Sequence, residues 1–535
     1  MTKKILWASL ILALSFSSCR KDDSADLDKV ISRELALSYT NNATTIRQNE
    51  AVTITVTGSQ ATTNPSGITW ELNGKQVAKG VSYTFQPSTP GRYTLTVSSA
   101  NRDFSVTREY MVEAYNPTPE LSLNFTNDAT TIQQLESITA TATGTEATTN
   151  PSGIIWELNG KEVSQGITYT FRPILPGRYT LVVKSSTKKD VSVTRDYTVE
   201  PRFTKGAFLL NEGNMTNETG TLSYVDVDGK VILDSVYIHI NGTKLGNVCQ
   251  DLTFANDKVY IISQNGPKNG GEGLLTIAKA NSLEKIKVFN DATLTKEWPT
   301  HIAVIGDRIY LRANDGIHVG TENGGFKLIE GTRGAQKIRM VTIGQRVFAS
   351  TSDKKILMIQ GDQVVKELTL ANTASGLALA DDGNLWVSYT KPNTIAKVNP
   401  DPSDFKIIAS NELKESPSVG WGATSGIFPF GNTIYFSGAT TTIRKHDFAA
   451  KTTSVFANIL DSKYAPEMKI HYNSLGVDPK TGYIYYAGIK GFGMDYKINT
   501  TFVLDPQGNI LVKKDNTNSF PAGWYFIPQK SVSYT

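Results

Sequence analysis

Leu252-Thr-Phe-Ala-Asn-Asp-Lys-Val-Tyr260 joins an apolar strand pattern, a tight polar turn and an aromatic-bearing strand pattern, and this unit decides the fold. Versions of it recur through the C-terminal part of the chain at Ile302–Tyr310, Val341–Phe348, Leu377–Trp386, Ile427–Tyr435 and Leu475–Tyr485. Their aromatic residues follow one another at intervals of 38 to 50 residues. That spacing is typical of four-stranded blades arranged around a central axis.

A further unit precedes these six, from Ala207-Phe-Leu-Leu210 to Leu222-Ser-Tyr-Val-Asp-Val227. The sequence therefore predicts a seven-bladed β-propeller over residues 203–535. The ring can close if Trp524-Tyr-Phe-Ile527 pairs with strands of the first unit. Such closure hides the sheet edges that would otherwise pair with other chains.

A duplicated segment lies ahead of the propeller, because Leu35–Ala114 recurs as Leu121–Glu200. Ala-Thr-Thr-Asn-Pro-Ser-Gly at 61–67 returns unchanged at 147–153, which is 86 residues later. Val52-Thr-Ile-Thr-Val56 alternates apolar and hydroxyl residues, as a strand with one buried face does. Asn73-Gly74 and its counterpart Asn159-Gly160 predict type I′ hairpins. We expect two β-sandwiches, with boundaries 34–116 and 117–202.

The Pro90-Gly-Arg-Tyr-Thr-Leu95 strand, which returns at 176–181, resembles the PKD family of immunoglobulin-like modules. We expect Trp70 on an early strand and Tyr93 on a late strand to fill the core between two such sheets. The predicted fold class is therefore all-β, with two tandem immunoglobulin-like β-sandwiches followed by a seven-bladed β-propeller. The sandwiches are spacers in one interpretation and adhesion or glycan-binding modules in the other, since fold alone does not assign a task.

Composition excludes several functions. Positive and negative charges are interspersed, with 54 Lys and Arg against 50 Asp and Glu, so nucleic-acid binding has no electrostatic basis. Cys249 is the one cysteine besides Cys19, and we expect it to be a small core residue. The chain contains no HExxH, P-loop, Cys-rich or G-x-S-x-G motif. We predict a protein that is not an enzyme and uses no cofactor or metal.

The N-terminus has the layout of a secretory signal. Lys3 and Lys4 precede the apolar stretch Ile5–Phe16, which is too short to span a bilayer, and small residues lead to Cys19. This ending resembles the lipobox of bacterial lipoproteins, which implies a signal peptide at 1–18, lipidation of Cys19 and an anchored linker at 19–33. Lys21-Asp-Asp23 resembles an export signal of Gram-negative lipoproteins, which implies an outer-membrane lipoprotein exposed on the cell surface.

Three blocks of the propeller carry a second resemblance: Phe208-Leu-Leu-Asn-Glu-Gly-Asn214, Gly220-Thr-Leu-Ser-Tyr224 and Leu245-Gly-Asn-Val-Cys-Gln-Asp251. They resemble the YncE-like propellers of surface lipoproteins that capture cobalamin. This resemblance implies that the chain captures a cobamide and delivers it to a TonB-dependent outer-membrane transporter. The alternatives are a surface adhesin or glycan-binding protein and, less favoured, a propeller lyase or lactonase.

A ligand of a propeller binds where loops vary freely, on the face from which the first strand of each blade starts. Aromatic side chains in such loops offer flat apolar area at low entropic cost, although some such rings pack between blades. His301 and His471 either contact a ligand or are solvated loop residues. Gln250 and Asp251 either hydrogen-bond amide groups of a ligand or hydrogen-bond the backbone of their own loop. The predicted ligand-binding residues are Asn211, Glu212, Asn214, Gln250, Asp251, Trp298, His301, Arg339, Trp421, His471, Tyr472, Trp524 and Tyr525.

Overall fold

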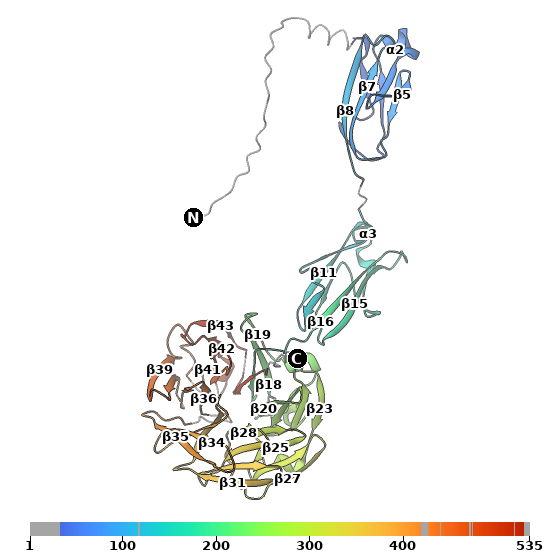
Figure 1. The fold of residues 1–535 in the computed structure, drawn as a ribbon. Coiled ribbons are helices and arrows are strands. Elements are labelled where there is room, and N and C mark those ends of the chain that lie inside the picture. Colours follow the sequence, from blue (N-terminus) through green and yellow to red (C-terminus); the bar gives the residue numbers. More distant parts are fainter. Residues whose placement is uncertain are drawn as a thin grey trace. The chain divides into compact units, whose positions relative to one another are not determined.

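The computed structural model describes residues 33–115, 118–418, 426–438, 440–469, 472, 475–517 and 519–528. These residues form an all-β protein, which confirms the predicted fold class (Figure 1). The predicted signal sequence and the predicted lipidation site at Cys19 lie outside the described residues, as do Trp421 and His471. In the part of the chain that is described, no helix has the length and apolar character needed to cross a membrane.

The first sandwich pairs a three-stranded sheet with a five-stranded sheet. The smaller sheet consists of β1 (Leu37–Tyr39), β3 (Val52–Val56) and β6 (Ser82–Phe85). The larger sheet consists of β2 (Thr45–Arg47), β8 (Ser105–Glu113), β7 (Gly91–Ser98), β4 (Thr69–Leu72) and β5 (Lys75–Lys79), in that order, and the short helices are α2 (Gln60–Thr63) and η1 (Pro65–Gly67). Trp70 fills the core between the sheets, and its Nε1 donates a hydrogen bond of 2.8 Å to the Gly80 carbonyl.

The second sandwich repeats this topology strand for strand. Its smaller sheet consists of β14 (Thr168–Phe171), β11 (Ile138–Thr143) and β9 (Ser122–Phe125). Its larger sheet consists of β10 (Thr131–Gln133), β16 (Ser192–Glu200), β15 (Gly177–Ser185), β12 (Ile154–Leu158) and β13 (Lys161–Gln165), and the helices are α3 (Thr145–Thr149) and η2 (Pro151–Gly153). Asn159 and Gly160 have φ values of 50° and 77°, which confirms the type I′ hairpin between β12 and β13.

The tyrosine that fills each sandwich core differs from the predicted one. Tyr93 is only half-buried, at the edge of the core against Phe85. Tyr110 on β8 is fully buried, with its ring centroid 5.0 Å from that of Phe85. Both tyrosines point to the core face, because they pair directly across β7 and β8, but Tyr93 lies near the start of β7, at the end of the core.

Seven four-stranded antiparallel sheets follow within the described residues, which confirms the predicted blade count. Six of them use consecutive strands. They are β20 (Cys249–Ala255), β21 (Lys258–Ser263), β22 (Leu275–Lys279) and β23 (Lys285–Phe289); β24 (His301–Ile305), β25 (Arg308–Ala313), β26 (Gly316–Thr321) and β27 (Gly324–Leu328); and β28 (Val341–Ile343), β29 (Arg346–Ser350), β30 (Lys355–Gln360) and β31 (Gln363–Thr369). The next three are β32 (Ala374–Leu379), β33 (Leu385–Tyr389), β34 (Thr394–Asn399) and β35 (Lys406–Glu412); β36 (Phe428–Phe430), β37 (Thr433–Phe436), β38 (Thr442–Asp447) and β39 (Thr452–Asn458); and β40 (Leu475–Val477), β41 (Ile484–Ile489), β42 (Asn499–Leu504) and β43 (Ile510–Asp515).

The seventh blade closes the ring with strands from both ends of the domain. It combines β44 (Pro521–Phe526) with β17 (Ala207–Asn211), β18 (Thr221–Asp226) and β19 (Val231–Leu233). β44 pairs antiparallel with β17, and it also lies against β20 and β40 of the neighbouring blades. The predicted closure by Trp524–Ile527 is therefore confirmed. Short helices occupy the connections: α4 (Val236–Asn241), η3 (Lys268–Gly270), α5 (Ala292–Lys296) and η4 (Asp495–Lys497).

The recurring aromatic residues hold adjacent blades together. All six lie on the second strand of a blade and are at most 4% exposed: Tyr260, Tyr310, Phe348, Trp386, Tyr435 and Tyr485. Cys249 is fully buried as expected, and burial raises the pKa of its thiol to about 12. The thiol is therefore a core group rather than a nucleophile.

The second sandwich and the propeller belong to one compact unit that begins at Leu121. Leu135 of the sandwich is 7% exposed, in the same apolar cluster as Phe203 and Phe208 of the propeller segment. Gln134 is fully buried, and its Nε2 donates a hydrogen bond of 2.9 Å to the carbonyl of Ser282.

Candidate functional site

The innermost strands of the seven blades are β44, β20, β24, β28, β32, β36 and β40. Because every blade uses the same strand order, these strands all start from one face of the ring, which we call the loop face. β17 ends on that face too, since Asn211 pairs with Pro521 at the start of β44. Residues just before the innermost strands, or just after β17, are therefore brought around the axis although they are far apart in the sequence.

Glu212 forms the first half of a polar cluster at the axis. It follows β17 and is 6% exposed, and the Tyr472 hydroxyl, from the segment before β40, donates a hydrogen bond of 2.8 Å to its Oε2. Burial raises the pKa of Glu212 to about 7, while the Lys337 ammonium and hydrogen bonds from Tyr472 and Gln250 lower it in part. Glu212 therefore carries a partial charge close to neutral pH.

Asp251 on β20 forms the second half. Its Oδ1 accepts a hydrogen bond of 2.7 Å from the Tyr525 hydroxyl, and its Oδ2 accepts one of 3.1 Å from the Ile302 amide. Arg339 Nε lies 3.4 Å from Oδ1, and the guanidinium carbon lies 4.3 Å from the centre of the Tyr525 ring. Burial raises the pKa of Asp251, and the charge of Arg339 opposes that rise. Gln250 precedes Asp251 in the chain and so joins the two halves.

We call this set the axial cluster: Asn211, Glu212, Gln250, Asp251, Lys337, Arg339, Tyr472 and Tyr525. Several of its buried polar atoms have no hydrogen-bond partner among the described residues, namely Asn211 Oδ1, Glu212 Oε1, Gln250 Oε1, and Nε and Nη2 of Arg339. Buried polar groups in native proteins are nearly always hydrogen-bonded, so such a concentration calls for water or a ligand. The cluster offers acceptors, donors and two cationic groups in one place.

An aromatic rim borders the axial cluster. Tyr472 contacts the rings of Phe520 and Phe492, with centroid distances of 5.6 and 6.4 Å, and Phe492 stacks on Phe520 at 6.1 Å. Phe492 is 54% exposed and Met494 is 68% exposed. Large apolar side chains left exposed beside buried polar groups are typical of a surface that binds something.

The structure brings seven of the predicted residues together: Asn211, Glu212, Gln250, Asp251, Arg339, Tyr472 and Tyr525. Trp524 instead packs between blades, 2% exposed and 5.1 Å from the Tyr485 ring, so we do not retain it as a ligand contact. Its position next to Tyr525 on a strand explains this, because the two side chains point to opposite faces.

The remaining predicted residues are spread along the loop face. Trp298 follows α5 and is 50% exposed, with a positive φ of 50°. His301 is fully buried at the start of β24, where its Nδ1 lies 3.0 Å from the Thr300 hydroxyl. Asn214 is half-buried and caps its own loop through a hydrogen bond from the Thr216 amide. Among the described residues, no three His, Cys, Asp or Glu side chains are placed to hold a metal ion.

The predicted ligand-binding residues did not include Lys337, Phe492 and Phe520. Lys337 lies in the segment before β28, two residues from the predicted Arg339. Residues just before the first strand of a blade lie on the loop face, so the same rule places Lys337 there. Phe492 follows β41, and residues after the second strand of a blade belong to the loop face by the same rule. What the sequence did not reveal is that these loops contact each other.

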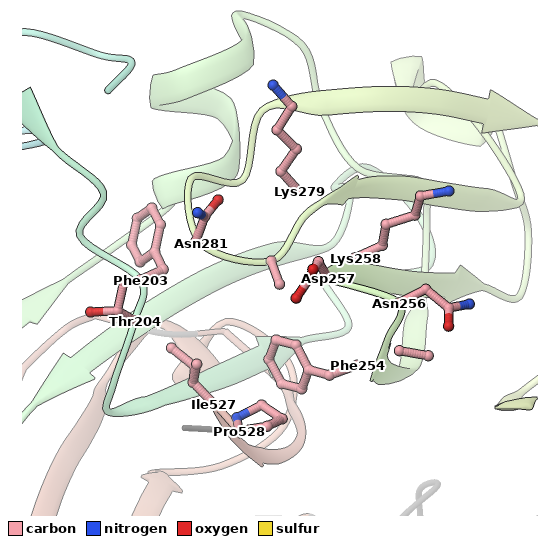
Figure 2. Close-up of a pocket in the computed structure, with 12 residues that line it drawn as sticks. Phe203, Thr204, Phe254, Asn256, Asp257, Lys258, Lys279, Asn281, Ile527 and Pro528 are labelled. Carbon is pink, nitrogen blue, oxygen red and sulfur yellow. The ribbon is translucent and has the colours of Figure 1, made fainter. Parts of the chain in front are cut away.

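A cavity of about 660 Å³ lies on the opposite face, beside the turn between β20 and β21 (Figure 2). Phe203, Phe254 and Ile527 form its apolar part. Two of its polar groups have partners within the protein: Asn256 donates a hydrogen bond of 2.7 Å to the Gly306 carbonyl, and Lys258 pairs with Glu322 at 2.8 Å. No residue lining this cavity has a buried side-chain atom without a partner in the described part of the chain, whereas five such atoms gather at the axis, so we take the axial cluster as the candidate site.

Fold and site together define a class: an all-β protein with a seven-bladed propeller that gathers buried polar side chains around the axis of its loop face. Residues 205–529 match the family described as a domain of unknown function (DUF5074), and the chain belongs to that family. No curated protein matches the chain.

The chain is similar to several solved structures at low sequence identity. The chain is similar to a quinonprotein alcohol dehydrogenase-like protein from Bacteroides thetaiotaomicron, with 17% identity and a TM-score of 0.50 over 74% of this chain and 96% of that one. It also matches BamB from Moraxella catarrhalis, with 13% identity and a TM-score of 0.36 over 60% and 85% of the two chains. A protein of unknown function from Bacteroides caccae matches with 10% identity and a TM-score of 0.32 over 60% and 98%.

Proposed function

We propose that this chain is a binding protein that holds a small ligand at the axial cluster without transforming it. The observation that supports this is the set of buried, unpartnered polar atoms at the axis, which come from β17, β20 and the segment before β28. Groups of this kind are costly to leave unsatisfied, at about 1–3 kcal/mol each, so a ligand that satisfies them gains that free energy on binding.

The ligand class that we propose is a cobamide. Two of the three sequence blocks that resemble the cobalamin-capturing propellers supply four residues of the axial cluster, namely Asn211, Glu212, Gln250 and Asp251. Amide groups at the periphery of a corrin ring are donors for the free oxygens of Asn211, Glu212 and Gln250. The exposed Phe492 ring offers apolar area to the ring itself.

We further propose that the chain is an outer-membrane lipoprotein on the cell surface, tethered through Cys19, and that it passes its ligand to a TonB-dependent transporter. The lipobox-like N-terminus and the residues after Cys19 support the tether. A glycan is the second candidate ligand, because the aromatic rim beside a carboxylate suits the stacking of a sugar ring. The two sandwiches would then hold an adhesive propeller away from the membrane.

The test is isothermal titration calorimetry of the intact protein with cobalamin and with cobinamide. We expect saturable binding of one ligand per chain, and Tyr472→Ala to weaken it by about tenfold or more through loss of a ring contact and of the Glu212 hydrogen bond. Tyr115→Ala, at an exposed position of the first sandwich, is the matched control and keeps wild-type affinity. Absence of heat at micromolar concentrations, with binding on a glycan array instead, would replace the cobamide by a sugar.

A further inference from the structure

We infer that the axial cluster recognises an oxyanion, a phosphate ester carried by the ligand, between Lys337 and Arg339. This inference rests on the proposed function for the site and adds the chemistry of the group that the site selects. Two cationic side chains come from one short segment before β28 and reach carboxylates that belong to other blades.

Some N–H donors of Arg339 make no hydrogen bond to the described residues. A guanidinium carries five N–H donors in a fixed fork, and that fork matches phosphate geometry. Arg339 Nε lies at an ion-pair distance of 3.4 Å from Asp251 Oδ1, but neither Nε nor Nη2 makes a hydrogen bond to the described residues. Asp251 already accepts hydrogen bonds from the Tyr525 hydroxyl and the Ile302 amide, so its oxygens are largely occupied. The guanidinium is thus held in place with unused donors.

Lys337 is the second cation. Its side chain is half-buried, and no hydrogen bond joins its ammonium to any residue in the described part of the chain. Burial and the neighbouring Arg312 lower the pKa of Lys337, and Glu212 raises it. A cation with one like-charged neighbour and one partly protonated carboxyl nearby is incompletely neutralised, so an added anion is favourable there.

The charge count supports an anion rather than a cation. Within the axial cluster, Lys337 and Arg339 supply the positive charge, and Asp251 and Glu212 supply the negative charge. Arg312, which neighbours Lys337, is itself faced by Asp315 and so adds little to this count. Glu212 is protonated in part at neutral pH because its pKa is about 7. The remaining groups at the cluster, the hydroxyls of Tyr472 and Tyr525, are neutral, since burial raises both pKa values. The cluster therefore carries net positive charge in a partly dehydrated place, where electrostatic attraction is strong.

The probe is dimethyl phosphate, titrated into the intact protein by calorimetry at constant ionic strength, with acetate and chloride as comparison anions. We expect saturable binding of dimethyl phosphate, tighter than that of acetate. Lys337→Met should raise the Kd for dimethyl phosphate about tenfold, as loss of one charge-assisted contact does, and Lys337→Arg should restore it. Glu212→Gln should lower the Kd about threefold, because the competing carboxylate is gone while an acceptor for Tyr472 remains.

Lys366→Met is the matched control, because Lys366 is exposed on β31 of the blade that Lys337 leads into. A melting temperature close to that of the wild type shows that Lys337→Met remains folded. Unchanged phosphate affinity in Lys337→Met, an equal loss in Lys366→Met, or tighter binding of acetate overturns the inference.

Two corrinoids separate this inference from the proposed function. Cobalamin carries a phosphodiester in its nucleotide loop and cobinamide lacks it, so we expect cobalamin to bind with the lower Kd. We expect this difference in Kd to disappear in Lys337→Met. Equal affinity for both would overturn phosphate recognition and leave the cobamide proposal standing. Phosphate binding through Lys337 without binding of either corrinoid would overturn the cobamide proposal and leave the oxyanion site standing.

Discussion

At the scale of single residues, Glu212 makes stability depend on pH. Burial raises its pKa in the folded protein to about 7, above the ordinary value of 4.5. The folded state therefore holds a proton more tightly than the unfolded chain does. Its contribution is fully present below pH 4.5 and is lost as pH rises through about 7.

We therefore expect the free energy of unfolding of the propeller to fall by about 3 kcal/mol between pH 5 and pH 8 through this group. Glu212→Gln has no carboxyl to titrate, so the difference between variant and wild type isolates the effect of Glu212 from that of Asp251. Thermal melts across this pH range measure it. Identical pH profiles for the two proteins would show that Glu212 is solvated rather than buried.

At the scale of elements, β44 decides whether the ring closes. This strand pairs with β17, which lies more than three hundred residues earlier in the chain, and it buries Trp524 against Tyr485 of β41. Side chains of β17, β18 and β19 also pack against β41, β42 and β43, but β44 supplies the strand pairing that joins the two ends of the domain. The aromatic contacts of Tyr485 with Trp524 and Phe526, at 5.1 Å each, are the core of this closure.

Trp524→Ala should lower the stability of the propeller by about 3–5 kcal/mol, the usual cost of removing a buried aromatic side chain. Trp298→Ala is the natural comparison, because Trp298 is also on the loop face but is 50% exposed. We expect its melting temperature to stay within about 1–2 °C of the wild type, since exposed side chains contribute little. Calorimetric melts of both variants decide the matter, and equal destabilisation would mean that Trp298 packs between blades as well.

At the scale of the whole molecule, the two sandwiches are attached differently although they arose from one repeat. The loop residues Leu135, Ile174 and Leu175 of the second sandwich stand where the first has Asn49, Ser88 and Thr89. Leu135 and Leu175 pack against the propeller cluster that contains Phe203, whereas their counterparts in the first sandwich are exposed. The second sandwich is thus part of the propeller's compact unit rather than an independent spacer.

Leu135→Asn, which installs the residue of the first sandwich, should reduce the unfolding free energy of this unit by about 2–4 kcal/mol. It should also raise the hydrogen exchange of amides around Phe203 and Ser282, where the sandwich contacts the propeller. Asn49→Leu is the reciprocal control and should change neither quantity, because position 49 is exposed. Independent unfolding of sandwich and propeller in the wild type would contradict a shared unit.

The repeats, and through them the fold, follow from local patterns in the amino-acid sequence. Six strand–turn–strand units with buried aromatic residues predicted the blades, and the duplicated Trp70 and Asn73-Gly74 motifs predicted the sandwiches. Local patterns suffice for this, because the alternation along a strand and the turn between two strands are properties of neighbouring residues. The same patterns placed Glu212, Asp251 and Tyr525 on the loop face.

Only the tertiary structure decided which loop residues meet. Glu212 and Tyr472 are 260 residues apart, and Asp251 and Tyr525 are 274 apart, so no local pattern links them. Tyr525 points to the axis and Trp524 into the blade interface because β44 has one register with β17, and a shift by one residue would exchange them. Burial, unpartnered atoms and the raised pKa of Glu212 all follow from that convergence, which exists only once the ring is closed.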